Sequence, residues 1–177
     1  MGEALGGRVN KEASARGRVV MFEPAIVVRK PREEDVGELA RLILRFYMFN
    51  EEFDPSMELA PNAREAAFEI AKSRVKDGGL TLIAVAEGKV IGYVYGIVAE
   101  NPMLARRSIG VLKELYVIPE ERMKGVATML IEHAKREFSK LGIRHVAVEF
   151  PARNIIAEKF YEKIGFRKFT NIYLKEV

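Results

Sequence analysis

Residues 112–138 constrain the fold of this chain more than any other stretch, because a strand pattern there leads through a glycine turn directly into a helix pattern. The run from Leu112 to Ile118 is rich in strand formers, and Pro119 ends it because proline has no N–H for a ladder. Beyond the turn, apolar side chains recur at helical spacing with charged residues on the wetter side. The apolar positions of this helix are Val126, Leu130, Ala134, Phe138 and Leu141.

The turn between the two patterns has the form Arg-x-x-Gly-x-Ala, with Arg122, Gly125 and Ala127 at its fixed positions. The first N–H groups of a helix have no intrahelical partner and carry the positive end of the helix dipole. Gly125 lets a ligand oxygen approach the backbone closely, and Arg122 and Lys124 add full positive charge. The stretch therefore predicts a site for an anion such as a pyrophosphate. The alternative is a surface loop in which the glycine only eases a turn.

Two motifs of the chain resemble the Gcn5-related N-acetyltransferases (GNAT superfamily). In that family a strand, a Gln/Arg-x-x-Gly-x-Gly/Ala turn and a helix hold the pyrophosphate of acetyl-CoA, and residues 122–127 match this order. The resemblance covers residues 25–177 and implies an α/β (α+β) fold with a mixed, mostly antiparallel central sheet. The implied order is β-α-α-β-β-β-α-β-α-β, with helices on both faces. The second motif comprises Asn154, Ala157, Phe160-Tyr161-Glu162-Lys163 and Gly165-Phe166.

Hydrophobic periodicity and turn residues place the other elements in the same order. Residues 1–23 are interpreted as a flexible N-terminal extension, and residues 24–177 as a single N-acetyltransferase domain. Strands are predicted at 25–29, 80–86, 90–99, 109–117, 145–150 and 166–174, and the other helices at 36–47, 62–76 and 155–164. Asn62 and Asn154 are predicted as helix N-caps, residues 77–79 as a helix stop and residues 87–89 as a hairpin turn.

Composition narrows the function class. The 177 residues, 49% of them hydrophobic, suit one domain with a substantial core. The net charge of +4 (29 − 25) comes from charges mixed along the chain, so no nucleic-acid partner is expected. Cysteine is absent and only two histidines occur, so we expect no disulfide, no cysteine nucleophile and no metal site. Since neither a membrane-spanning run nor the apolar core of a secretory signal is present, we expect a cytoplasmic protein without a membrane partner.

The resemblance implies acetyl-CoA as cosubstrate. The pantetheine arm would lie along the backbone of Leu115, Tyr116 and Val117, one of whose N–H groups would polarise the thioester carbonyl. Asn154 would contact the arm as well as cap its helix. The pyrophosphate would be held by Arg122, Met123, Lys124, Gly125, Val126, Ala127 and Thr128.

The resemblance also implies the catalytic groups. Tyr161, four residues after Ala157, would protonate the departing thiolate, and we expect it beside an apolar stripe of Ile156, Phe160 and Ile164. Glu149 and Glu114 are the candidate general bases, with Glu149 preferred, and proton loss through water alone is the alternative. Strand alternation places Glu114 on one face with Leu112 and Tyr116 unless a bulge resets it.

The acceptor is left open by the sequence. The segment 51–61 carries Glu51, Glu52, Asp54 and Glu58, and is interpreted either as a solvated connector or as a wall that attracts a cationic amine. The expected activity is direct acetyl transfer to a primary amine, which is a protein N-terminus, a lysine or a small cationic amine. The alternative is a non-catalytic module of the same fold that binds acyl-CoA or a partner. A homodimer is also left open.

Overall fold

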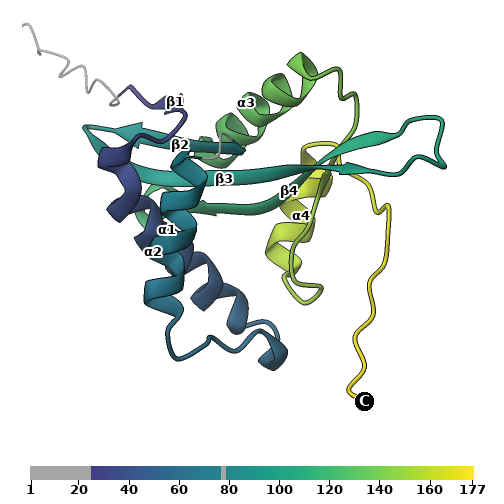
Figure 1. Cartoon of the computed structure of the whole chain (residues 1–177), viewed down its shortest axis with the longest axis horizontal. Coiled ribbons are helices and arrows are strands. Elements are labelled where there is room, and N and C mark those ends of the chain that lie inside the picture. Colours follow the sequence, from purple (N-terminus) through teal and green to yellow (C-terminus); the bar gives the residue numbers. More distant parts are fainter. Residues whose placement is uncertain (1–24, 77–78) are drawn as a thin grey trace, which may run out of the picture.

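The computed structural model describes residues 25–76 and 79–177, in which five strands form one sheet with helices packed on both faces (Figure 1). Short 3-10 turns lie at Glu33–Asp35, Pro55–Met57 and Pro119–Glu121. The predicted extension 1–23 and most of the predicted helix stop at 77–79 lie outside the described residues. Within the described ranges, no helix is long and apolar enough to cross a membrane. The elements are β1 (Val27–Arg29), α1 (Val36–Glu51), α2 (Ala63–Lys76), β2 (Leu80–Ala86), β3 (Lys89–Glu100), β4 (Ser108–Val117), α3 (Val126–Lys140), β5 (Val146–Val148) and α4 (Ile155–Lys163).

The strands lie side by side in sequence order, from β1 to β5. All neighbouring pairs are antiparallel except β4 and β5, which are parallel. The turn between β2 and β3 is formed by Glu87 and Gly88, whose φ angles of 50° and 75° are both left-handed. Such angles suit a tight hairpin turn that follows the twist of the strands. The predicted mixed sheet and its hairpin are therefore present.

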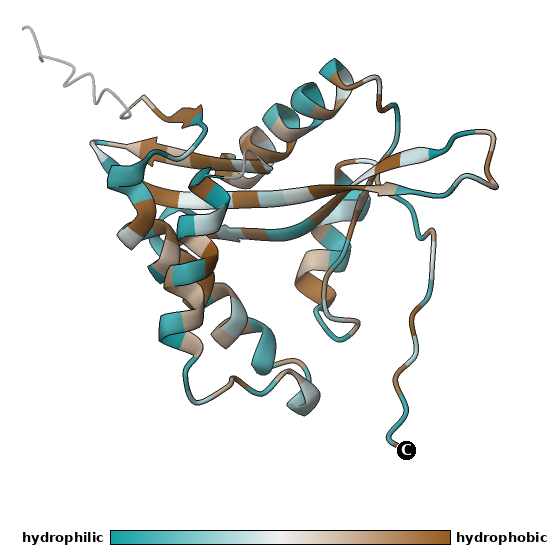
Figure 2. Cartoon of the chain, in the orientation of Figure 1, coloured by the Kyte–Doolittle hydropathy of each residue, from teal (hydrophilic) through white to brown (hydrophobic). Residues whose placement is uncertain are grey.

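Each face of the sheet is covered by its own pair of helices. On one face, α3 and α4 pack against β2, β3 and β4, and on the other α1 and α2 do the same. Figure 2 shows hydrophobic and hydrophilic residues alternating around the helices, as expected for elements with one buried side. The predicted apolar positions of α3 are buried except Leu141, which is 68% exposed because α3 ends at Lys140. Gly142, with φ of 77°, ends the helix as predicted.

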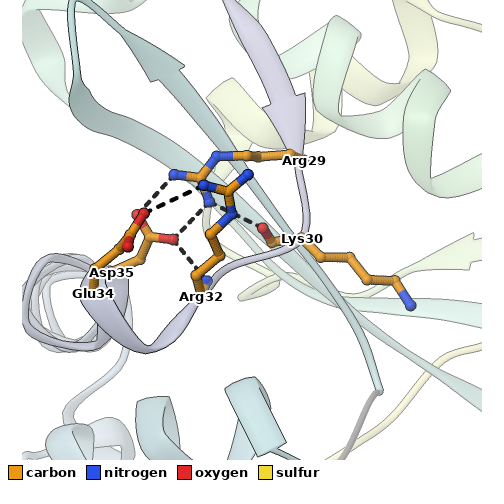
Figure 3. A network of polar contacts seen from close by, with 5 residues as sticks. All are labelled: Arg29, Lys30, Arg32, Glu34 and Asp35. Atoms are coloured by element: carbon orange, nitrogen blue, oxygen red, sulfur yellow. Dashed lines mark hydrogen bonds and ion pairs between the residues drawn. The ribbon is translucent and has the colours of Figure 1, made fainter.

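A buried carboxylate fixes the start of α1 beside β1. Asp35 accepts hydrogen bonds from Arg29 at 2.6 and 3.0 Å and from the backbone N–H of Arg32 at 2.7 Å (Figure 3). The hydrogen bond from Arg29, supported by that from Arg32 and opposed by burial, lowers the pKa of Asp35. Helix α1, which ends at Glu51, is thereby anchored to the edge of the sheet.

The predicted final strand, 166–174, is not formed, and this expectation was wrong. After Gly165, whose φ is 94°, the chain has no regular structure and runs away from the sheet (Figure 1). Strand propensity describes a side chain's fit to a sheet surface, and a strand forms only where a partner edge is within reach. The rest of the predicted order, up to α4, is confirmed.

Candidate functional site

The glycine turn leads into α3 as predicted, and its mouth is open to solvent. The first hydrogen bond of the helix runs from the Met129 N–H to the Gly125 carbonyl at 3.0 Å. The N–H groups of residues 126–128 therefore have no acceptor within the helix. Val126 is buried and Ala127 half-buried, whereas residues 122–125 and Thr128 are exposed. These N–H groups therefore face a region that an anion can enter.

The backbone of the turn is held in an uncommon conformation. Gly125 has φ of 82° and Met123, a residue with a side chain, has φ of 63°. Left-handed conformations of this kind are uncommon outside glycine and cluster at ligand sites. A Cβ placed on Gly125 would have no atom within 4 Å, so the protein leaves the space over the turn empty. At Gly125 the turn therefore faces solvent and is not covered by another element.

The two basic side chains of the turn are engaged differently. Arg122 donates from Nε to the carbonyl of Val117 at 3.0 Å, and its guanidinium carbon lies 5.2 Å from the ring centroid of Phe49 and 5.6 Å from that of Tyr116. Arg122 therefore ties the turn to the end of β4 and to α1. Lys124 is exposed and pairs with Glu121 at 3.2 Å.

The backbone of β4 is paired on one side only near the turn. Residues 110–112 pair with β5, and the Glu149 N–H donates to the Leu112 carbonyl at 3.0 Å. Leu115, Tyr116 and Val117 pair with β3, and no pairing with β5 reaches them in the described part of the chain. The backbone edge of these three residues that faces away from β3 is where the pantetheine arm is expected from the sequence.

A β-bulge at Lys113 sets the direction of the side chains on β4. Tyr95 pairs with Glu114 and Gly96 with Leu112, so Lys113 is the extra residue. Leu112 consequently packs with α3, whereas Tyr116 packs with α1. Plain alternation, which would place Leu112 with Glu114 and Tyr116, is wrong here because of this bulge.

Glu114 lies in a buried polar network. Arg74 donates to both of its carboxylate oxygens, at 2.7 and 2.6 Å, and the hydroxyls of Tyr93 and Tyr47 donate at 2.8 and 3.1 Å. The side chains of Glu114 and Arg74 are 4% and 10% exposed, and the Arg74 guanidinium lies 3.8 Å from the ring centroid of Tyr95. A carboxylate offers about four lone-pair sites, and four donors use them here. Glu114 is therefore poorly placed to take a proton from a substrate.

The phenols of this network remain protonated. Burial, followed by the charge of Glu114, raises the pKa of Tyr47 to about 12 and that of Tyr93 well above its usual value. Both hydroxyls can therefore keep donating to Glu114. Neither these tyrosines nor Arg74 could be recognised from the sequence as partners of Glu114, because they are 21 to 67 residues away from it along the chain.

Glu149, the other candidate base, lies where β4 and β5 cease to pair. Its side chain is 44% exposed and forms an ion pair with Lys113, the bulge residue. This carboxylate is reachable from solvent, in contrast to that of Glu114.

Tyr161 is the buried residue of α4, at 7% exposed. It contacts Phe150, Phe160 and Phe166, with ring centroids 5.2, 5.2 and 5.6 Å away. The predicted stripe is wrong at Ile156, which is 77% exposed, because the helix turns Tyr161 itself towards the sheet.

Burial raises the pKa of Tyr161. Within the part of the chain that the structure describes, its hydroxyl has no hydrogen-bond partner. Asn154 is the N-cap of α4, as predicted, because its Oδ1 accepts the Ala157 N–H at 2.9 Å.

An open cleft of about 680 Å³ lies between the end of α1 and the end of β4. Glu51, Glu52 and Glu120 line it together with Arg45 and Arg122, and Met48, Phe49 and Tyr116 supply apolar surface. Asp54 of the acidic segment instead caps the turn Pro55–Met57 by accepting the Ser56 N–H at 3.0 Å. Among the described residues, no group of three acidic, histidine or cysteine side chains could hold a metal ion.

Comparison with known proteins identifies the same family that the two sequence motifs resemble. Residues 39–166 match the acetyltransferase (GNAT) family. An uncharacterised N-acetyltransferase of Archaeoglobus fulgidus is 26% identical over 142 residues, which are 80% of this chain and 92% of that protein. An aminoglycoside N(6')-acetyltransferase type 1 of Salmonella typhimurium is 29% identical over 90 residues, half of this chain and 62% of that protein.

The fold is shared with solved structures of acetyltransferases. An aminoglycoside N-acetyltransferase in complex with CoA superimposes with a TM-score of 0.70 at 18% identity, over 90% of this chain and 99% of that one. The fold class predicted from the sequence is thereby confirmed.

Proposed function

Because the chain belongs to the acetyltransferase (GNAT) family, we propose that this N-acetyltransferase moves the acetyl group of acetyl-CoA directly to a primary amine of a cationic acceptor. The observation that carries the acceptor class is the cleft beside β4, where the three carboxylates of Glu51, Glu52 and Glu120 outnumber the guanidiniums of Arg45 and Arg122. Carboxylates along a cleft raise the local concentration of cations. The Salmonella relative is named for an amine-rich acceptor class, which agrees with this proposal.

The proposed cofactor position follows from the two open backbone segments. The pyrophosphate would accept hydrogen bonds from the first N–H groups of α3, with Lys124 adding charge. The pantetheine arm would lie along residues 115–117, on the edge that β5 leaves open. Asn154 uses one side-chain oxygen for its helix cap, and its amide N–H groups remain able to donate to the arm.

The turn gives a direct test of cofactor binding. Gly125→Ala should weaken CoA binding at least about tenfold, because the left-handed backbone is strained for alanine and the methyl group enters the ligand space. Gly142→Ala is the matched control, since Gly142 also has positive φ and open space but lies at the other end of α3. Calorimetric titration with CoA measures the effect. Equal affinities of the two variants would remove the turn from the cofactor site.

Acetyl transfer requires two proton movements. The amine nitrogen forms a bond to the thioester carbon, the carbon–sulfur bond breaks, and the amine loses a proton while the thiolate gains one. We assign the donor to Tyr161, whose hydroxyl has no protein partner within the described ranges, and the acceptor to Glu149, directly or through water. Glu114 keeps a structural role, because its carboxylate is already used by Arg74, Tyr93 and Tyr47.

The acceptor class is tested with a panel of amines of increasing charge. Thiol release from acetyl-CoA should be fastest with acceptors carrying two or more amino groups and slow with neutral amines. Glu51→Gln combined with Glu52→Gln should raise KM for a polycationic acceptor about tenfold or more, with KM for acetyl-CoA unchanged. Glu65→Gln, on the exposed first turn of α2, is the control. Faster turnover of neutral amines, or no change in KM, would overturn the acceptor proposal.

A further inference from the structure

The cleft between the ends of α1 and β4 contains charges of both signs that do not neutralise one another. Its acids are Glu51, Glu52 and Glu120, and its bases are Arg45 and Arg122. Among the described residues, the side chains of the three acids and of Arg45 form no ion pair and no hydrogen bond. The cleft therefore offers a ligand an unpaired cation as well as unpaired carboxylates.

Several basic residues on the helices are, in contrast, paired with an acid one turn earlier, as helical geometry allows. These pairs are Arg41–Glu38 on α1, Lys72–Glu69 on α2, and Lys135–Glu132 and Lys140–Glu137 on α3. The residues one turn before and after Arg45 are Arg41, Leu42, Met48 and Phe49. None of them is acidic, so the charge of Arg45 has no partner one turn away on its own helix and stays available in the cleft.

The spacing along α1 places opposite charges at the two ends of an apolar strip. Arg45, Met48, Phe49 and Glu52 stand at positions i, i+3, i+4 and i+7, which lie on one face of a helix, and all four line the cleft. Glu52 follows the last residue of α1 with helical backbone angles, φ −62° and ψ −21°. Seven helical residues rise by about 10 Å. A ligand lying along this face would contact a guanidinium, then apolar surface, then a carboxylate.

Arg122 is less suitable than Arg45 as the cation that contacts an acceptor. It belongs to the turn at which we place the pyrophosphate, and its Nε already donates to the Val117 carbonyl at 3.0 Å. The negative charge of a pyrophosphate beside Arg122 would offset that of its guanidinium. Arg45 belongs to the α1 wall of the cleft and not to the turn, so it remains a free cation when the cofactor is bound.

We propose that the acceptor is a small diamino carboxylic acid. Its carboxylate binds Arg45, and one of its ammonium groups binds Glu51 and Glu52. The aliphatic carbons between these charges lie over Met48 and Phe49, and the second amino group is acetylated. This inference rests on the proposed function and narrows its cationic acceptor to one that also carries a carboxylate.

The chemistry of the cleft supports a small molecule of this class. A guanidinium can hold a carboxylate by two parallel N–H···O bonds, which an acceptor with amino groups alone cannot accept. The volume of about 680 Å³ lies in the range of small-molecule sites, roughly 300–1,000 Å³. The transfer itself is unchanged. The free amine forms the bond to the thioester carbon and loses its proton to Glu149, while the carbon–sulfur bond breaks and Tyr161 protonates the thiolate.

The test compares acceptors that differ only in the carboxylate. Ornithine and lysine are compared with putrescine and cadaverine, which have the same stems and amino groups without it. Each diamino acid should have a kcat/KM, measured as thiol release from acetyl-CoA, at least about tenfold above that of its diamine, as expected for a hydrogen bond between charged groups.

Variants of Arg45 assign that preference to one residue. Arg45→Gln should raise KM for lysine at least about tenfold, without raising KM for cadaverine or for acetyl-CoA. Arg45→Lys should recover part of the loss, because it keeps the charge but not the paired donors. Arg41→Gln is the matched control. It lies one turn earlier on α1, pairs with Glu38 and is not among the residues that line the cleft, so it should change none of these constants.

Failure of this inference can be distinguished from failure of the proposed function. Diamines acetylated as well as the diamino acids, or an unchanged KM for lysine in Arg45→Gln, would overturn the carboxylate site and leave the cationic acceptor standing. A raised KM for acetyl-CoA in Arg45→Gln would also overturn it, because Arg45 would then belong to the cofactor site. If neutral amines were acetylated and neither diamines nor diamino acids were, the cationic acceptor would fail and the carboxylate site with it.

Discussion

Replacing Tyr161 with phenylalanine is expected to lower kcat for acetyl transfer by about 10²- to 10³-fold, with KM for acetyl-CoA little changed. The substitution removes a single oxygen and keeps the ring that contacts Phe150 and Phe166. The proton for the departing thiolate must then come from water in a site walled by aromatic side chains. Steady-state kinetics measured as thiol release give both constants.

Burial fixes the pH behaviour of this step. Because burial raises the pKa of Tyr161, the phenol stays protonated through the pH range in which a free tyrosine would ionise. Ionisation of Tyr161 should therefore not lower kcat in that pH range. Tyr173→Phe is the matched control, since that tyrosine is 90% exposed, and it should leave kcat unchanged. Equal kcat for Tyr161→Phe and the wild type would mean that the thiolate is protonated by another group.

The glycine turn could be predicted because its conformation is a local property. The left-handed φ of Gly125 favours a residue without a Cβ, and the apolar spacing after it defines α3 within a single stretch of sequence. The N-cap at Asn154 is local in the same sense, because its side chain bonds the N–H three residues on. Such features are specified by residues that are neighbours in the chain.

The rest of the site depends on contacts that local patterns do not contain. The bulge at Lys113 is a property of the pair β3–β4, and it decides which face receives Glu114. The donors to Glu114 come from α1, α2 and β3. The local sequence therefore could not show that Glu114 forms a buried ion pair and is not an accessible base. The predicted final strand is absent although residues 166–174 have strand propensity, because the tail runs away from the sheet and does not pair with the edge strand β5 (Figure 1).

Replacing Arg74 with methionine is expected to destabilise the protein by about 3–5 kcal/mol, because Glu114 then keeps a buried charge without its cation. For a chain of this size the loss corresponds to a fall in Tm of roughly 10 °C. Thermal unfolding followed by circular dichroism measures it. Lys72→Met, also on α2, is the control: its pair with Glu69 is exposed and 3.8 Å long, so its loss should cost less than about 1 kcal/mol.

Glutamine substitutions at Glu114 and Glu149 should change different properties, because Glu114 lies in the buried network and Glu149 is exposed. Glu114→Gln should lower Tm, as Arg74→Met does, because it leaves the guanidinium of Arg74 buried without its counter-charge. Glu149→Gln, at an exposed position, should leave Tm unchanged and lower kcat at neutral pH, with partial recovery as pH rises and more of the amine is unprotonated. If Glu114→Gln instead kept its Tm and lost its activity, the buried carboxylate would be the base and the ion pair with Arg74 would have to open during catalysis. The geometry favours the first result, because a carboxylate that accepts bonds from an arginine and two tyrosines loses all of them when it turns to a substrate.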